Sequence, residues 1–137
     1  MLHDDEKRFF INGNHQTIID KKEVRIAPAI CYESLQATHF EKVQQLGATI
    51  YLASVAKPQN GIDKAYPYFA ELARHNSISI LMVNCIGYCD NFFSVGQSAV
   101  WNKKGQCVGQ LSDKEEGILL YDTKTEKTKI VLRKSKH

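Results

Sequence analysis

Three short apolar runs, separated by two amphipathic stretches, constrain the fold of this 137-residue chain most strongly. The apolar runs span residues 24–31, 48–54 and 78–85, and they are rich in the β-branched side chains that favour strands. Between them, residues 32–46 and about 64–76 carry apolar side chains at helical spacing. Strand–helix–strand–helix–strand order predicts an α/β layered fold in which neighbouring strands run parallel.

Local signals refine these elements. Pro28 lies inside the first apolar run, and because proline cannot donate to a β-ladder it favours an edge or a bulge there. Gly47 is placed to cap the end of the first helix. Residues 96–111 predict a β-hairpin turning at Lys103-Lys104-Gly105, and residues 117–121 are expected to form the last strand.

Composition and charge narrow the classes of protein further. The chain is 43% hydrophobic and 24% charged, as ordinary globular domains are. It has no run of about 18 apolar residues, and its first eight residues are rich in charge and lack the apolar core of a secretory signal, so we expect a cytoplasmic protein with no membrane partner. The net charge of +3 is uneven, because the C-terminal end is basic. We predict a domain at 1–122 and a solvated basic tail at 123–137, which lacks the aromatic side chains that favour a nucleic-acid partner.

Four cysteines occur, at Cys31, Cys85, Cys89 and Cys107. A cytosolic chain is not expected to form disulfides. The C-x3-C pair has no second pair beside it, so no metal site is expected, because zinc needs four ligands. Buried, inert thiols are one interpretation of these cysteines. A thiol redox protein that uses Cys85 and Cys89 is another.

The segment Ile30-Cys31-Tyr32-Glu33 is the one in which chemistry is expected. Cys31 ends a predicted buried strand and directly precedes a predicted helix, and ligands of α/β sheets bind at the carboxyl ends of strands. A helix N-terminus favours a thiolate, and its N–H groups can stabilise an oxyanion. Cys31 is therefore a candidate nucleophile, with a structural buried cysteine as the alternative.

Residues 25–33, Arg-Ile-Ala-Pro-Ala-Ile-Cys-Tyr-Glu, resemble the nucleophile segment of the carbon–nitrogen hydrolase (nitrilase-like) superfamily. Three further stretches agree with this resemblance. Residues 46–50 are similar to its small-Gly-Ala entry into the next strand, residues 76–87 to its strand ending in Asn-x-x-Gly, and residues 96–109 to its Gly-x-Ser hairpin. The resemblance covers nearly the whole chain and implies that this is the C-terminal half of a four-layer αββα sandwich.

The resemblance also implies a mechanism. Cys31 would attack the carbon of an amide or nitrile and form a thioacyl intermediate, with no metal or organic cofactor. In the family a glutamate is the general base and a lysine stabilises the oxyanion, and both would fall upstream of Met1. Glu6 matches a second family glutamate near the site, with a solvated N-terminal acid as the alternative.

Further residues are candidates for supporting roles. Tyr32 would offer its backbone N–H to the oxyanion. Ser54 would hydrogen-bond substrate, unless it is a plain serine at a strand end. Glu33 is expected to cap the helix after Cys31. Lys57 follows the neighbouring strand and would approach the same edge of the sheet, with a solvated loop lysine as the alternative.

Two functional interpretations follow. The first is a carbon–nitrogen hydrolase acting on a small carboxamide, carbamoyl or nitrile-like substrate. The second is a non-catalytic remnant or interaction module, because two partners of the family's catalytic triad are missing. Missing strands would leave open edges and an uncovered apolar face. We therefore expect a homo-oligomer or a complex with a separate N-terminal half.

Overall fold

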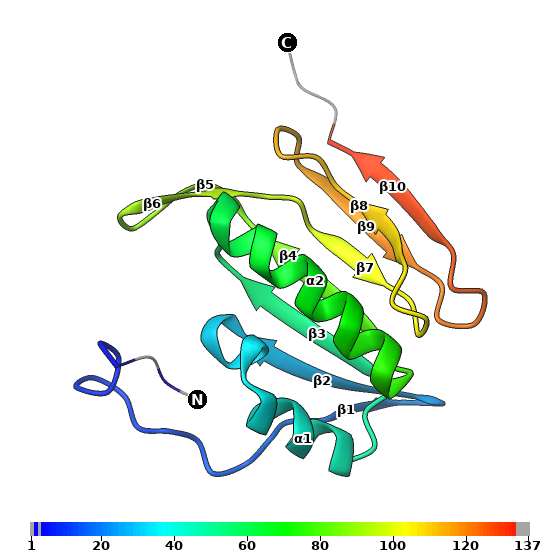
Figure 1. Ribbon diagram of the computed structural model, residues 1–137, viewed down its shortest axis with the longest axis horizontal. Helices are drawn as coiled ribbons and strands as arrows, with labels where there is room; N and C mark the ends of the chain where they lie inside the picture. Colours follow the sequence, from blue (N-terminus) through cyan, green and yellow to red (C-terminus); the bar gives the residue numbers. More distant parts are fainter. Residues whose placement is uncertain (1, 3, 134–137) are drawn as a thin grey trace.

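A computed structural model describes residues 2 and 4–133 and shows one large sheet with both α-helices on the same face (Figure 1). Its elements in chain order are β1 (Ile19–Lys21), β2 (Val24–Ile30), the 3-10 helix η1 (Cys31–Leu35), α1 (Ala37–Gln45), β3 (Ile50–Val55), α2 (Gln59–Asn76), β4 (Ser79–Asn84), β5 (Ile86–Cys89), β6 (Phe92–Val95), β7 (Ala99–Trp101), β8 (Cys107–Gln110), β9 (Gly117–Tyr121) and β10 (Thr128–Leu132).

The sheet has the strand order β1-β2-β3-β4-β7-β8. Its central strands β2, β3 and β4 are parallel, with Ile30 opposite Ser54 and Ser54 opposite Val83. The outer strands β1, β7 and β8 are antiparallel to their neighbours. The predicted α/β fold with neighbouring parallel strands is confirmed, and so is the hairpin formed by β7 and β8.

The two faces of this sheet differ in burial. The face under the helices is sealed, because every second residue along the central strands is buried there; these are Ala27, Ala29, Tyr51, Ala53, Val55, Ile80, Met82 and Asn84. On the other face Ile50, Ser79 and Val100 are buried, but residues nearer the carboxyl ends of the central strands, such as Ile30, Ser54 and Val83, are exposed. The expectation that the first strand would be buried along most of its length was therefore wrong, since only one face of it is covered.

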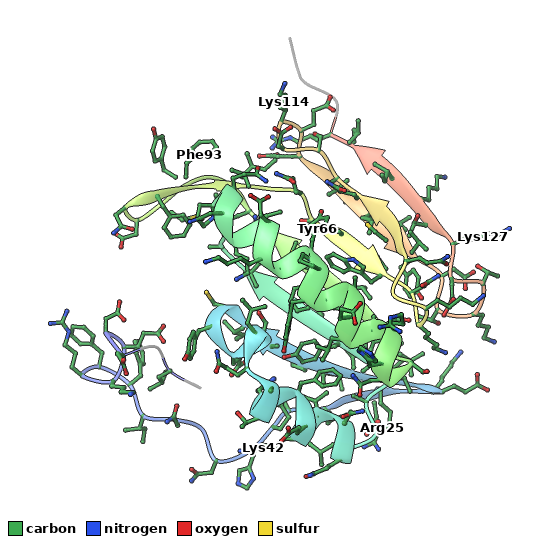
Figure 2. The ribbon with its side chains drawn as sticks, in the orientation of Figure 1. Arg25, Lys42, Tyr66, Phe93, Lys114 and Lys127 are labelled. Carbon is green, nitrogen blue, oxygen red and sulfur yellow. The ribbon has the colours of Figure 1, made fainter. Side chains whose placement is uncertain are left out.

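Aromatic contacts fix α2 on the sheet. The rings of Tyr66 and Phe69 approach the indole of Trp101 on β7, with centroids 4.9 and 5.5 Å away. The Tyr66 hydroxyl also donates to the carbonyl oxygen of Gln97 at 2.7 Å. Figure 2 labels Tyr66 on α2, above β7. This packing holds the beginning of α2 beside the carboxyl ends of the parallel strands.

The predicted helix at 32–46 is two helices. The chain is extended at Gln36, between η1 and α1. Side chains in the first turn bind the backbone instead of leaving it free to form an α-helix: Ser34 donates to the Cys31 carbonyl at 2.6 Å, and Glu33 accepts from the Ile30 N–H at 2.7 Å. The α-helix ends as predicted, with Gly47 in the left-handed conformation (φ 72°) after it.

Other boundaries also differ from the prediction. Helix α2 begins at Gln59, directly after Pro58, rather than near residue 64. The chain from 86 to 95 forms a hairpin, β5–β6, that turns at Asp90-Asn91. Residues 117–121 are not the last strand, because β10 pairs with them.

Pro28 is accommodated because β2 is an edge at that point. Strand β1 pairs with residues 24–26 of β2, so among the described residues Pro28 meets β3 on one side and no strand on the other. There the Gln16 side chain donates to the Pro28 carbonyl at 3.1 Å. The predicted edge position of this proline is confirmed.

The sheet face opposite the helices is partly covered by the β9–β10 ribbon. A groove of about 250 Å³ runs between this ribbon and the sheet, lined mainly by apolar side chains such as Leu52, Leu81 and Ile118. Ile30 and Val83 on the same face are 67% and 54% exposed. This is the uncovered apolar face that the sequence predicts.

Within the described residues, no helix is both long and apolar enough to cross a bilayer.

The difference between the two faces can be tested on adjacent residues of β4. We expect Met82→Lys to destabilise the domain by more than about 3 kcal/mol, because it places a charge in the sealed core, where Met82 is 1% exposed. Val83→Lys should cost less than about 1 kcal/mol. Urea unfolding followed by circular dichroism measures both; equal losses would contradict the described burial.

Candidate functional site

Cys31 lies at the carboxyl end of β2, at the bend where the chain enters η1. Its backbone has φ of 47°, in the left-handed region that residues other than glycine rarely adopt. This conformation costs about 1–2 kcal/mol and turns the side chain out of the sheet. The thiol is exposed, so the alternative of a buried structural cysteine is wrong. In the described structure the other three cysteines are not buried either.

The bend after Cys31 is held by hydrogen bonds rather than by a long helix. Glu33 binds the backbone N–H of Ile30, as its predicted capping role requires. The α-helix that was expected at residue 32 begins only at Ala37, so its dipole does not point at the thiol as predicted. The N–H groups of one tight turn remain beside Cys31.

A buried polar pair, His39 and Tyr51, lies next to the Glu33 carboxyl of this bend. His39 Nε2 lies 3.8 Å from Glu33 Oε1, and His39 Nδ1 is 2.8 Å from the Tyr51 hydroxyl. Burial lowers the pKa of His39, which keeps the ring neutral, although the nearby Glu33 charge opposes this. The Nε2 atom of His39 has no hydrogen-bond partner among the described residues, so it approaches the Glu33 carboxyl without bonding to it. Sequence periodicity alone gave no reason to single it out.

Lys57 lies at the end of β3, the strand beside β2. It is only 9% exposed, so the alternative of a solvated loop lysine is wrong. Its stem passes close to α2, since a Cβ at Gly61 would lie 3.2 Å from the Lys57 Cβ. Burial lowers the pKa of the Lys57 ammonium, and the charge of Cys31 opposes that shift. The predicted approach of Lys57 to the Cys31 edge is thus supported by an electrostatic interaction between the two side chains.

Asn84 fixes the backbone of Lys57. Its Oδ1 accepts from the Lys57 N–H at 2.8 Å, and its Nδ2 donates to the carbonyls of Lys57 and Gly96 at 3.1 and 2.7 Å. The buried Ser94 hydroxyl lies within hydrogen-bond distance of Asn84 Oδ1 and the Lys57 backbone. Asn84 therefore joins the ends of β3, β4 and β6, which explains physically why an asparagine suits this position. Sequence resemblance had marked Asn84 without a role, and Ser94 was missed.

The other predicted site residues are less closely tied to Cys31. Glu6 is exposed in an N-terminal turn, where its carbonyl accepts from the N–H groups of Phe9 and Phe10. Tyr32 follows Cys31 in η1 and is 41% exposed. Ser54 is exposed at the end of β3, opposite Ile30. Substrate-binding roles for Tyr32 and Ser54, and a catalytic role for Glu6, stay predictions.

Cys85 and Cys89 form a separate thiol pair, with Cys85 directly before β5 and Cys89 at its end, next to the turn. Their sulfur atoms are 3.2 Å apart, with both thiols free. Hydrogen bonds from Ser94 and Cys89 lower the pKa of the Cys85 thiol, and the bond with Cys85 raises that of Cys89. The hairpin extends from the sheet edge where β2 and β3 end (Figure 1). The redox interpretation of this pair remains a prediction.

The structure thus defines an α/β domain with an exposed thiol on a strained bend at a parallel sheet edge. The model of the carbon-nitrogen hydrolase family matches residues 2–129, so the chain belongs to that family. A comparison with curated proteins found no match.

Solved structures share the fold. Glutamine-dependent NAD+ synthetase from Acinetobacter baumannii is 25% identical, with a TM-score of 0.79 over 96% of this chain and 26% of its own. The E41Q mutant of an amidase from Nesterenkonia sp. AN1, which shows Michael addition of acrylamide at the active-site cysteine, is 16% identical with a TM-score of 0.73 over 98% of this chain and 48% of its own. Nit3 of Saccharomyces cerevisiae, from the nitrilase superfamily, is 19% identical with a TM-score of 0.71 over 81% of this chain and 42% of its own. The chain therefore spans a quarter to a half of the length of these proteins.

The role of Asn84 can be tested against a second asparagine of equal burial. We expect Asn84→Asp to destabilise the domain by about 2–4 kcal/mol at pH 7, because the introduced carboxylate would face the carbonyls of Lys57 and Gly96. Asn102→Asp should be nearly neutral, since Asn102 Oδ1 accepts from the N–H groups of Lys104 and Gln106.

Chemical denaturation as a function of pH measures both Asn variants. The folded chain would hold the carboxyl introduced at position 84 protonated more strongly than the unfolded chain does. The loss of stability in Asn84→Asp should therefore appear as pH rises above about 4 and shrink as pH falls toward that value. A pH-independent loss in Asn84→Asp, or an equal loss in Asn102→Asp, would contradict the assignment.

Proposed function

We propose that this chain carries the nucleophile half of a carbon–nitrogen hydrolase that acts on a small carboxamide, carbamoyl or nitrile-like substrate. The observation that supports this most directly is the exposed Cys31 thiol on its left-handed bend, beside a buried lysine. Family membership and the amidases among the structural neighbours support the reaction class.

The proposed reaction begins with attack of the Cys31 sulfur on the substrate carbon. With an amide, the carbon–sulfur bond forms as the carbonyl electrons move to oxygen, and the Tyr32 N–H is our candidate donor to that oxyanion. The oxyanion then collapses, the carbon–nitrogen bond breaks, and the amine leaves with a proton. Water hydrolyses the thioester and restores the thiol.

We propose that the general base and the family's oxyanion lysine come from a segment outside residues 2–129, the part of this chain that matches the family model. That segment would either precede residue 1 in a longer product or belong to a separate N-terminal half. In this view Glu6 lies at the junction with it. The alternative, a non-catalytic module, keeps the same fold and the same exposed thiol but requires no turnover.

Acrylamide provides a direct test of the nucleophile. We expect Cys31 to form an adduct by Michael addition faster than the same cysteine in an unfolded peptide of residues 25–37, because the bend exposes the sulfur beside N–H donors and an ammonium. Peptide mass spectrometry resolves the four cysteines, and Cys107 serves as the exposed internal control.

Ammonia release from butyramide then separates the two interpretations, since butyramide was bound by the Nesterenkonia amidase. Turnover that disappears in Cys31→Ser supports the hydrolase. A reactive Cys31 that gives no turnover even when a complementing N-terminal half is added supports the non-catalytic module, and labelling no faster than in the peptide argues against the proposed nucleophile.

We also propose that the open sheet face is covered by a second copy of the chain or by a complementing N-terminal half. Ile30 and Val83 are exposed on the sheet, and Ile118 and Leu120 are exposed on the ribbon that partly covers it. Exposed apolar patches are typical of interaction surfaces. In sedimentation velocity, the chain should associate with rising concentration, and Val83→Lys should shift it toward monomer. A chain that stays monomeric at high concentration leaves only the N-terminal half as the partner.

A further inference from the structure

The two thiols of the Cys85–Cys89 pair are closer together than their spacing in a strand allows. Four residues of a straight extended chain span about 13 Å, so two thiols at that spacing would not meet. The two sulfur atoms nevertheless lie 3.2 Å apart, and both thiols are free. The chain therefore bends between them. Gly87, at the middle of the segment, has φ of 119°, a conformation that residues other than glycine rarely adopt.

The backbone that carries the pair is fixed on both sides of this bend. The Cys85 carbonyl accepts from the Gly96 N–H at 2.8 Å, and Cys89 is the last residue of β5 that pairs with β6. Between them, the ring of Tyr88 meets the ring of Phe93, which Figure 2 labels, edge-on with centroids 5.2 Å apart. The fold thus holds the two thiols side by side before any bond joins them.

A reagent in solution can reach the pair. Cys85 is exposed and Cys89 is half-buried. Cys85 also lines a cleft of about 300 Å³, together with Ser98 and Leu111, which leaves space beside it. Hydrogen bonds from Ser94 and from Cys89 lower the pKa of the Cys85 thiol, whereas the bond with Cys85 raises the pKa of Cys89. Cys85 is therefore the better candidate for the attacking thiolate.

We propose that Cys85 and Cys89 form a reversible dithiol–disulfide site that exchanges with low-molecular-weight disulfides. The Cys85 sulfur attacks one sulfur of the small disulfide, whose S–S bond breaks, and the first small thiol leaves with the Cys85 proton. The Cys89 sulfur then attacks the Cys85 sulfur of the mixed disulfide, and the second small thiol leaves with the Cys89 proton. The chain is oxidised by two electrons and the small disulfide is reduced by two.

This exchange requires little movement and is separate from the proposed hydrolase reaction. A disulfide bond is about 2.05 Å long, so the two sulfur atoms need to approach by only about 1 Å. Cys31 takes no part in it, and loss of Cys31 should leave it intact. The site would make the β5–β6 hairpin a segment whose covalent state follows the ratio of small disulfide to small thiol around the protein.

Equilibration in glutathione buffers tests the site. The whole chain is incubated over a range of ratios of oxidised to reduced glutathione, with and without a denaturing concentration of urea, then quenched in acid, alkylated and digested with trypsin. The tryptic peptide of residues 75–103 holds no other cysteine. When the disulfide forms, this peptide resists alkylation and lacks two hydrogens, and cleavage after Tyr88 leaves its two parts joined.

We expect the folded chain to be half oxidised at a ratio at least about tenfold lower than the unfolded chain requires, because folding already holds the thiols together. Cys107→Ser should leave this ratio unchanged. Equal ratios in the folded and the unfolded chain would overturn the site. So would glutathione bound to Cys85 or Cys89 with no bond between the two cysteines.

Two glycine variants test the bend. Gly87→Ala should move the ratio of the folded chain toward that of the unfolded chain, since alanine resists a φ of 119° although its Cβ would meet no atom within 4 Å. Gly13→Ala, whose Cβ is equally unobstructed and whose φ is not in the left-handed region, is the matched control and should leave the ratio unchanged. An unchanged ratio in Gly87→Ala would contradict the role of the bend.

Two serine variants test the order of attack. Cys89→Ser should accumulate the mixed disulfide at Cys85 about threefold faster than Cys85→Ser accumulates it at Cys89, because the more acidic and more exposed thiol reacts first. A faster reaction in Cys85→Ser would overturn the assignment of Cys85 as the attacking thiol. Circular dichroism checks that both variants are folded, and the unsubstituted chain in glutathione buffers tests the site without them.

Discussion

The in-register parallel pairing of β2, β3 and β4 is the constraint on which the rest of the structure depends. It brings the ends of three strands to one edge, so that Cys31, Lys57 and Asn84 become neighbours although they are far apart in the chain. It is possible because small alanines alternate with large side chains under the helices, which lets α1 and α2 pack closely on one face. Antiparallel pairing would have sent these residues to opposite ends of the sheet.

The edge is then locked by polar groups rather than by more apolar packing. Asn84 uses both its carbonyl and its amide to hold the Lys57 backbone, and Glu33 and Ser34 hold the turn that follows Cys31. Buried polar networks whose members are satisfied rigidify a core and specify one geometry. At this edge, that geometry is what keeps a strained cysteine and a buried lysine residue in place.

The amino-acid sequence predicted the three central parallel strands and the position of Cys31 at the end of the first, because apolar runs and their spacing are local signals. It failed where tertiary contacts or local side chains decide. The helix expected after Tyr32 is interrupted at Gln36, since Glu33 and Ser34 bind the backbone there. The β5–β6 hairpin was missed although Asp90-Asn91 is a turn signal, and β10 was assigned to a basic tail because its charges masked the strand pattern. The burial of Lys57 and His39 depends on neighbours far away in sequence.

The open sheet face leaves this domain incomplete by itself. It presents apolar side chains to water that nothing within the described residues covers, and a bound partner would remove them from water. Ile30 and Ser54 of the open face directly adjoin the strand ends that carry Cys31 and Lys57. A partner bound to that face would therefore also form one side of the site. Covering the sheet and completing the ligand site are therefore expected to be coupled.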